Sequence, residues 1–185
     1  DFDYYVMALS WSPTWCALEG DERGSPQCEQ DFGWVLHGLW PQYENGWPSY
    51  CNTRERNPSR SDTSAQSDLF GSSGSAWHQW NKHGRWSGLP SSDYYALSRE
   101  AYARIERPAL LRQLDRSVRL PATVIEDAFL EANPDLSADK ITITCKAGRI
   151  HEARICLTRD LELRNCGRDV RRDCTMKDAL FDPIN

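Results

Sequence analysis

WHQWNKHG, at residues 77–84, combines two histidines, a lysine and two tryptophans within eight residues. Imidazole is the side chain whose ordinary pKa lets it gain and lose protons near neutral pH, so two imidazoles beside a cation indicate proton transfer on an anionic substrate. A third histidine, His37, lies in a second aromatic-rich stretch, GWVLHGLWPQ at residues 33–42. Because a base and an acid must act on opposite sides of a reacting atom, we expect the fold to bring these two stretches together.

Helical spacing predicts how the first stretch presents its polar groups. Residues 75–82 can form a short helix that Gly84 ends. His78 and Lys82 are four residues apart and would share one face, whereas His83 is turned away from His78 by about 140°. This spacing differs from the His-x-x-x-His pair that binds zinc, so no metal site is expected. It suits a helix end at which His83 reaches forward, flanked by His78 and Lys82.

Short apolar runs predict two strands in the first part of the chain. Residues 3–12 and 32–39 are rich in aromatic and branched side chains and are followed by Pro or bounded by Gly and Pro, as is typical of buried strands. The second strand would deliver His37 at its end. Residues 13–28 have the Gly and Pro content of a loop. Residues 52–75 are polar and Ser-rich, which predicts a long surface loop or a locally disordered one.

The second half of the chain changes from a helical to an alternating pattern. We expect helices at residues 93–106, with Ser91 or Ser92 as cap, at 109–115 and at 121–132. We expect an antiparallel hairpin of strands at residues 141–145 and 149–157, with His151 in a structural or solvent-facing role. Histidines on both sides of the long polar loop belong to one site, so no domain boundary is expected there. These patterns predict one α+β domain over residues 1–185, with an antiparallel β-sheet flanked by several α-helices.

The charge of the chain limits how it could attract nucleic acid. Its formal net charge is -5 and its isoelectric point is about 5.4, so no overall basic field steers a polyanion toward it. Binding of a nucleic acid would have to be local and aromatic. The eight tryptophans make stacking surfaces plausible, although large aromatic side chains more often fill a core.

The seven cysteines indicate an oxidising compartment, because cytosolic proteins seldom keep so many except for metal binding. A Cys-x-x-Cys pair is absent, which argues against structural zinc. The chain opens without a basic, apolar leader and has no run of about 18 apolar residues. We therefore expect a mature form without a signal peptide, not associated with a membrane, that is secreted, periplasmic or located in an acidic vesicle.

HGLWPQ at residues 37–42 and WHQWNKHG at residues 77–84 resemble the two active-site segments of the ribonuclease T2 family, the secreted acid endoribonucleases. LSWSPTWC at residues 9–16 is similar to the first strand of that family and the Pro and Cys that follow it, and the C-terminal cysteines resemble its disulfide region. The resemblance implies a disulfide-stabilised ribonuclease T2-like fold and an endoribonuclease that cleaves single-stranded RNA without metal or other cofactor. The ribose 2′-hydroxyl would form a 2′,3′-cyclic phosphate, which water opens to a 3′-phosphate.

Motif position also implies catalytic roles. His83 resembles the base that acts on the 2′-oxygen, His37 the acid that acts on the leaving 5′-oxygen, and His78 a phosphate-holding group. Lys82 would stabilise the charge of the transition state. The family usually has Glu where this chain has Gln79, which can donate a hydrogen bond to a phosphoryl oxygen but cannot exchange a proton. We therefore expect activity to be reduced and not abolished.

Base binding must rely on flat side chains, because unstacked RNA bases are held by stacking and by hydrogen bonds to their edges. Trp40 and Gln42 lie at positions similar to base-site residues of the family. Tyr43 and Trp47 are neighbouring candidates for substrate binding. Two further tryptophans are expected in the core: Trp34 and Trp80.

The resemblance bears on the cysteines as well. It implies two disulfides, Cys145 with Cys174 and Cys156 with Cys166. Once Cys51 is set aside, Cys16 and Cys28 are left as a third pair. The family commonly has a cysteine at the position of Trp86, which ordinarily pairs with one at the position of Cys51. Cys51 is therefore expected to be free.

Two other interpretations stay open. The chain could be a family member whose catalysis is weakened by the changes at Gln79 and Trp86. It would then be secreted as a module that binds RNA or protein. Retention of the three histidines and of Lys82 argues against this, because loss of function would be free to erase them. A secreted metal-binding or redox protein is disfavoured by the absent ligand spacing. We expect a monomer that takes single-stranded RNA as its substrate.

Overall fold

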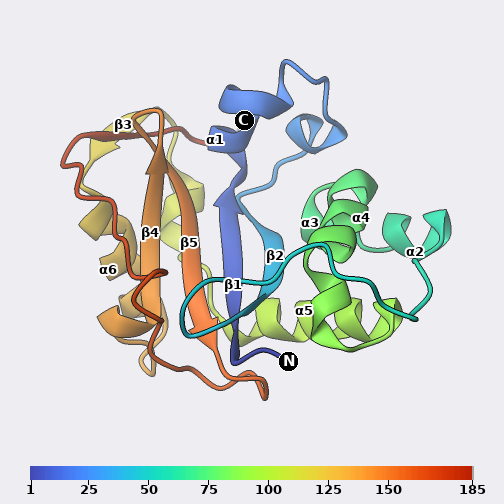
Figure 1. Cartoon of the computed structure of the whole chain (residues 1–185). Coiled ribbons are helices and arrows are strands. Elements are labelled where there is room, and N and C mark those ends of the chain that lie inside the picture. The colour runs from blue at the N-terminus through green and yellow to red at the C-terminus, as the bar shows by residue number, and fades with distance from the viewer. Residues whose placement is uncertain (185) are drawn as a thin grey trace.

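Residues 1–184 are described by the computed structural model of the chain, and within them six strands form one sheet beside six α-helices (Figure 1). The strands are β1 Tyr4–Trp11, β2 Trp34–Gln42, β3 Val118–Leu120, β4 Ile141–Lys146, β5 Arg149–Leu157 and β6 Ala179–Phe181. The helices are α1 Ser12–Trp15, α2 Arg60–Ser64, α3 Ser67–Phe70, α4 Ser73–Lys82, α5 Ser91–Arg104 and α6 Ala122–Ala132. Shorter 3-10 or π turns occupy Cys16–Gly20, Pro26–Glu29, Gly84–Ser87, Ala109–Gln113 and Ala138–Lys140.

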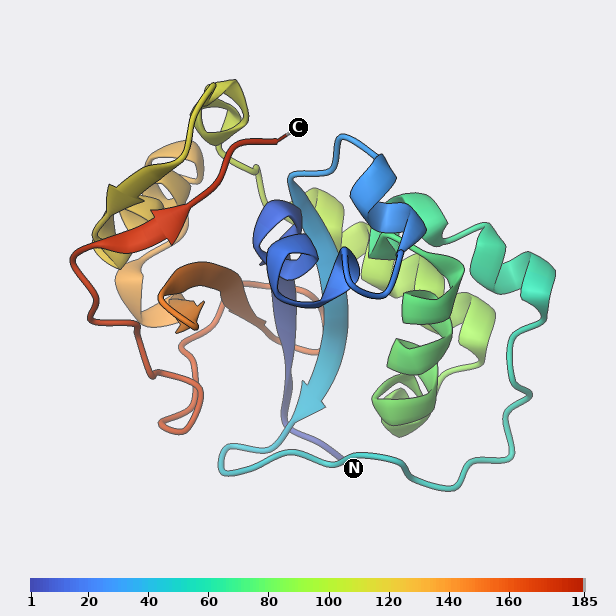
Figure 2. The ribbon, with the colours of Figure 1, turned by 90° about the horizontal axis from the view of Figure 1, so that it is seen from above.

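β1 lies between β2 and β5 and pairs with both in antiparallel register. β4 and β5 form the predicted hairpin, while β6 pairs with β3 and contacts β5 in parallel at Arg149 and Leu180. α3, α4 and α5 lie beside β2, and α6 lies beside β4 (Figure 1). Viewed from above, the pair of β3 and β6 stands on the opposite side of the molecule from α2 (Figure 2). The predicted α+β fold, a mainly antiparallel sheet flanked by helices, is confirmed.

Alternation along β1 supplies buried side chains to both faces of the sheet. One face contributes to the main core: Tyr5, Met7, Leu9 and Trp11. The opposite face contributes Tyr4 and Val6 to a smaller cluster around the Cys156–Cys166 disulfide. As predicted, Trp34 and Trp80 belong to the main core, with 4% and 0% of their surface exposed. β1 is therefore buried along its whole length, and most of a site beside it must be formed by its neighbours.

A β-bulge in β2 sets the position of His37. Ala8 of β1 pairs with Gly38, but Leu9 pairs with Leu36, so His37 is the extra residue between them. Bulges of this kind re-aim a side chain and are common beside active sites. The prediction that His37 lies at the end of its strand is wrong, because the residues after it continue to pair with β1.

A second bulge lies in β5. Thr144 of β4 pairs with Glu152, but Cys145 pairs with Ile150, so His151 is the extra residue. Ile150 belongs to the main apolar core. A regular strand would carry Glu152 on the same face as Ile150 because side chains repeat every two residues, and the bulge instead turns Glu152 to the other face.

Residues 13–28, predicted as a loop, are largely helical. α1 begins with Pro13 in its first turn, a position where the missing N–H of proline costs no hydrogen bond. The helical path continues through Cys16–Gly20, and the Cys16–Cys28 disulfide joins it to the turn Pro26–Glu29. Local Gly and Pro content was a misleading signal here because the disulfide and Pro13 favour compact turns.

Residues 52–75, predicted as a long surface loop, contain α2 and α3. A reciprocal capping box between Ser59 and Asp62 begins α2. Leu69 and Phe70 of α3 are buried in the main core, and Gly71 ends that helix with a φ of 88°, a left-handed conformation that suits glycine. The prediction failed because two apolar side chains are enough to dock a segment that is otherwise polar.

The remaining helices follow the predicted pattern closely. α5 and α6 are present, and the predicted piece near residue 110 is a short 3-10 turn. The predicted serine cap is wrong, because α5 starts directly after Pro90 and no side chain caps it. β3 and β6 were not predicted, because each has three residues and depends on pairing with the other.

Three disulfides are present, and they are the predicted pairs: Cys16–Cys28, Cys145–Cys174 and Cys156–Cys166. Among the described residues, Cys51 is the free cysteine and is partly buried. The described helices include none whose length and apolar content would suffice to cross a membrane.

Thiol titration provides a direct check on the cysteine pairing. Denatured protein that has not been reduced is expected to react with one equivalent of a thiol reagent per chain, because Cys51 is the cysteine outside the three disulfides. Full reduction should raise this to seven equivalents, the number of cysteines in the sequence. A monomer with no reactive thiol before reduction would contradict the pairing.

Candidate active site

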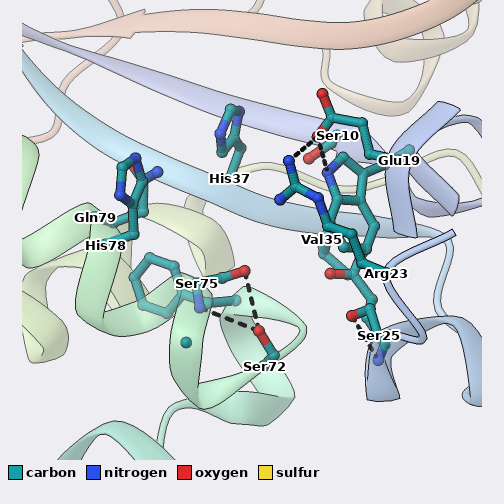
Figure 3. A pocket seen from close by; sticks show the side chains of 14 residues that line it. Ser10, Glu19, Arg23, Ser25, Val35, His37, Ser72, Ser75, His78 and Gln79 are labelled. Atoms are coloured by element: carbon teal, nitrogen blue, oxygen red, sulfur yellow. Dashed lines mark hydrogen bonds and ion pairs between the residues drawn. The ribbon is translucent and has the colours of Figure 1, made fainter. Parts of the chain in front are cut away.

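β2 and α4 carry the two histidine segments to one groove. His37 projects from β2, and His78 and Gln79 of α4 stand across from it (Figure 3). His83 follows directly after α4, where its backbone N–H donates to the carbonyl oxygen of Gln79 at 2.9 Å. The end of the helix thus delivers His83 to the same groove as His37.

A cavity of about 370 Å³ holds most of the predicted site residues. They line it together: His37, Trp40, Gln42, Trp47, His78, Gln79, Lys82 and His83. Tyr43, the remaining candidate, packs against the main core and is not a lining residue of this cavity or of the larger one beside it. All but one of the site residues predicted from the sequence therefore line this cavity, and the exception is Tyr43.

A second, larger cavity of about 580 Å³ continues the groove. The two cavities share His37, His78 and Gln79, so these side chains stand where the cavities meet. One wall comes from the helical segment after β1 and includes Glu19 and Arg23, and the other comes from the start of α4 and includes Ser72 and Ser75 (Figure 3). Trp15 and Gln27 also line this cavity. These residues were not predicted as part of a site, because they lie in segments predicted as loops.

Glu152 on β5 is a further site residue that sequence analysis missed. Its side chain is 1% exposed, its Oε2 is hydrogen-bonded to Nδ1 of His37, and its Oε1 accepts from Nη2 of Arg154 at 2.8 Å. Burial opposes the carboxylate, but the charges of His37 and Arg154 prevail and hold the pKa of Glu152 well below its usual range. Because Nδ1 is occupied by the carboxylate, Nε2 is the nitrogen of His37 that can face a substrate.

The contact between His37 and Glu152 crosses the central strand. β1 separates the strands that carry them, and its side chains at the crossing are small: Ala8 pairs with Arg154, and Ser10 pairs with Glu152. The bulge at His37 turns the imidazole over these small side chains. The pair therefore depends on three strands at once.

His83 is an uncharged imidazole in this environment. Its side chain is 6% exposed, its ring stacks on Trp40 with centroids 5.1 Å apart, and its buried Nδ1 has no hydrogen-bond partner within residues 1–184. Burial, followed by the charges of Lys82, His37 and His78, lowers the pKa of His83 to about 3. His83 therefore stays unprotonated in mildly acidic solution, which is the form that a base must have before it acts.

The lowered pKa of His83 predicts a specific loss of stability in acid. In the unfolded chain the imidazole of His83 takes up a proton near pH 6.5, but in the folded chain it does so only near pH 3. Unfolding between these pH values therefore takes up a proton, so the free energy of unfolding decreases as the pH is lowered. Relative to His83→Asn, the unmodified protein should lose about 2 kcal/mol of unfolding free energy between pH 6.5 and 4.5. Urea unfolding of both proteins at the two pH values measures this difference, and equal losses would contradict it.

Trp40 and Gln79 hold each other in a fixed orientation. Trp40 Nε1 donates to Gln79 Oε1 at 2.8 Å, so the amide nitrogen of Gln79 is the group that can still donate. Gly38 permits this contact, because a Cβ at that position would collide with both atoms of the hydrogen bond. The guanidinium of Arg154 lies 5.2 Å from the Trp40 ring, a cation–π arrangement, while Trp47 is 61% exposed at the rim.

His78 and Lys82 lie on the same face of α4, as their spacing predicts, and both line the smaller cavity. Burial, Lys82 and His37 lower the pKa of His78. His151 lines neither cavity. Among residues 1–184, Cys16, Asp21 and Cys28 form the one group with metal-ligand spacing, but its two thiols are joined in a disulfide.

Solved structures that superpose on this α+β chain include ribonucleases. An RNase-related protein from Calystegia sepium superposes with a TM-score of 0.73 at 20% identity, covering 100% of this chain and 99% of that one. RNase NT, crystallised with 5′-AMP, superposes with a TM-score of 0.72 at 20% identity, covering 99% of each chain. Identities this low establish the fold alone.

The chain belongs to the Ribonuclease T2 family, whose family model matches residues 2–166. A ribonuclease from Aeromonas hydrophila is 42% identical over 111 residues, which are 60% of this chain and 50% of that protein. A probable ribonuclease from Haemophilus influenzae is 32% identical over 122 residues, 57% of this chain and 44% of that protein. The chain thus spans about half the length of these relatives.

Proposed function

We propose that this chain is an endoribonuclease that cleaves single-stranded RNA by metal-independent transphosphorylation. The 2′-hydroxyl attacks the adjacent phosphorus, the 5′-oxygen leaves, and water opens the 2′,3′-cyclic phosphate to a 3′-phosphate. The observation that carries this proposal is the meeting of His37, His78 and His83, from two separate segments, around one groove. The named ribonucleases among its relatives support the same class of reaction.

In this proposal His83 is the base. It takes the proton from the 2′-hydroxyl, which requires an imidazole that is neutral before the reaction. Its lowered pKa, about 3, supports this role in acidic surroundings. Because Trp40 stacks against the ring, the imidazole is held in place while the hydroxyl approaches.

His37 is the acid of the first step. Nε2 gives its proton to the leaving 5′-oxygen. In the second step the same group takes a proton from the attacking water, and His83 returns its proton to the 2′-oxygen as the ring opens. Glu152 favours the charged imidazolium and fixes which nitrogen carries the transferred proton. Glu152 is thus a positioning residue that acts through His37.

The phosphate is held by groups of α4. Lys82 supplies positive charge for the phosphoryl oxygens as negative charge develops in the transition state. His78 and the amide nitrogen of Gln79 supply hydrogen-bond donors, since Oε1 of Gln79 is already engaged by Trp40. The substitution of glutamate by glutamine keeps a donor at the phosphate but removes a group that can exchange a proton.

The two cavities take the two nucleosides. His83 lines the smaller cavity and is not a lining residue of the larger one, so the attacking ribose and its base belong in the smaller cavity. Trp40 and Trp47 offer flat surfaces for that base, and each stacked base contributes about 1 to 3 kcal/mol. The leaving nucleoside then extends past His37 into the larger cavity.

At the level of the whole chain, we propose one monomeric catalytic domain over residues 1–185. The main core, whose buried residues extend from Phe2 to Phe181, supports a single folding unit. Three disulfides support an oxidising location, secreted, periplasmic or in an acidic vesicle, where the lowered pKa of His83 would also be useful.

Incubation with RNA and excess EDTA near pH 5 tests the proposed function. Products that end in 2′,3′-cyclic phosphate, formed at the same rate with and without EDTA, are the expected result. RNA that stays intact but bound would favour a binding module that has lost catalysis. Loss of cleavage on addition of EDTA would show that the reaction needs a metal ion and overturn the mechanism.

A further inference from the structure

The end of the smaller cavity away from His37 contains a hydrogen-bond network that the proposed chemistry does not use. Gln42, the last residue of β2, is 4% exposed and lines this end together with Asp169. Nε2 of Gln42 donates to the carbonyl oxygen of Gly46 at 2.9 Å and to Oδ2 of Asp169 at 3.4 Å. The same Oδ2 accepts from the backbone N–H of Gly46 at 2.7 Å.

These partners fix the orientation of the Gln42 amide. A backbone carbonyl and a carboxylate are both acceptors, so the NH2 group of Gln42 must face them, and the reversed amide would place oxygen against two oxygens. Both amide hydrogens are therefore committed to Gly46 and Asp169. The group that Gln42 can offer to a ligand is its carbonyl oxygen, an acceptor.

Asp169 comes from a part of the chain far from β2 in sequence. It lies in the segment between Cys166 and Cys174, whose disulfides tie it to β5 and β4. The turn after β2 is closed by a hydrogen bond from Tyr43 N to the carbonyl oxygen of Gly46 at 3.0 Å. Both partners of the Gln42 amide are thus anchored independently of any ligand.

We propose that this network selects the base of the attacking nucleotide, a conclusion that rests on the proposed function. A base stacked on Trp40 with its edge toward Gln42 must bring a hydrogen-bond donor to an acceptor that lies beside a carboxylate. Adenine, cytosine and guanine each carry an exocyclic amino group, whereas uracil has carbonyl oxygens on both sides of its one edge N–H. The site therefore favours amino-bearing bases over uracil, and Asp169 is the positioning residue for this preference.

Binding of nucleoside 3′-phosphates separates this inference from the question of catalysis. Calorimetry at constant salt concentration and pH is expected to give Kd values for 3′-AMP, 3′-CMP and 3′-GMP about 10-fold or more below that for 3′-UMP. The four dinucleotides with uridine as the leaving nucleoside, ApU, CpU, GpU and UpU, should show the same order in kcat/KM. If all four resist cleavage, the proposed function fails, while the Kd values still decide the base preference.

Two variants and a control test the role of Asp169. Asp169→Ala frees the Gln42 amide to turn. The Kd for 3′-UMP should then differ from that for 3′-AMP by no more than about 3-fold, chiefly because 3′-UMP binds more tightly. Gln42→Met removes the acceptor and should also abolish the preference. Asp160→Ala, which removes an exposed carboxylate elsewhere, should keep it. Binding of 3′-UMP as tight as that of the other nucleotides in the unmodified protein would overturn the inference, as would an unchanged preference in folded Asp169→Ala.

Discussion

Alanine in place of His83 is expected to lower kcat/KM for RNA by about 100- to 10,000-fold, and alanine in place of His37 should have an effect of similar size. In the proposed mechanism, each imidazole transfers a proton in the transition state, and the adjacent groups cannot take over. Lys82 is a cation, Gln79 is an amide and His78 holds the phosphate in this mechanism, so none of them is available to accept the proton of the 2′-hydroxyl. Initial rates on a defined single-stranded oligonucleotide measure both effects.

A substrate with an activated leaving group distinguishes the two roles. A nucleoside 3′-(4-nitrophenyl phosphate) releases a stable phenolate that needs no proton, so His37→Ala should cleave it at a rate close to that of the unmodified enzyme. His83→Ala should remain impaired on this substrate, because the 2′-hydroxyl still needs a base. Equal impairment of both variants on the activated substrate would contradict the assignment of acid and base.

His151→Ala is the matched control for these variants. His151 is the fourth histidine of the chain, lies at the bulge of β5 and lines neither cavity. Its replacement should change kcat/KM by no more than about 3-fold, well below the loss of an acid or base. A loss as large as that of His83→Ala would show that removal of any histidine disturbs the site.

The second large effect is expected for Glu152→Gln, which should lower kcat/KM for RNA by about 100-fold or more. Glutamine has the shape of glutamate, but it lacks the charge that favours the imidazolium of His37 and can impose the wrong tautomer; a comparable change in a serine protease triad costs about 10,000-fold. Activity of folded Glu152→Gln within about 3-fold of the unmodified enzyme would contradict this role.

A double variant tests whether Glu152 acts through His37. Once His37 is alanine, adding Glu152→Gln should cost little further activity, because residues that act as a unit are strongly non-additive. Glu152→Gln should also recover most of its rate on the 4-nitrophenyl substrate, as His37→Ala does. Glu131→Gln, an exposed carboxylate of α6, serves as control and should behave like the unmodified enzyme. Fully additive losses would contradict the coupling.

Much of the fold could be predicted from local patterns, and the failures have a common origin. α6 and the hairpin of β4 and β5 follow from helical and alternating periodicity, which depends on neighbouring residues alone. α3 did not follow, because its stability comes from Leu69 and Phe70 packing into a core formed by distant residues. Likewise β3 and β6 exist because they pair with each other.

The sequence by itself determined the family, through residue types at short, recognisable spacings in the segments that form β2 and α4, and the resemblance to that family implied the cysteine pairs that the structure contains. Tertiary structure alone decided what surrounds those residues. If side chains simply alternated along β5, Glu152 would lie on the same face as Ile150, in the apolar core. The bulge at His151 instead turns Glu152 toward His37. Asp169 reaches Gln42 through a disulfide-tied segment distant in sequence. Such contacts depend on strand register and on how segments distant in sequence pack together, and neither can be predicted from the spacing of neighbouring residues.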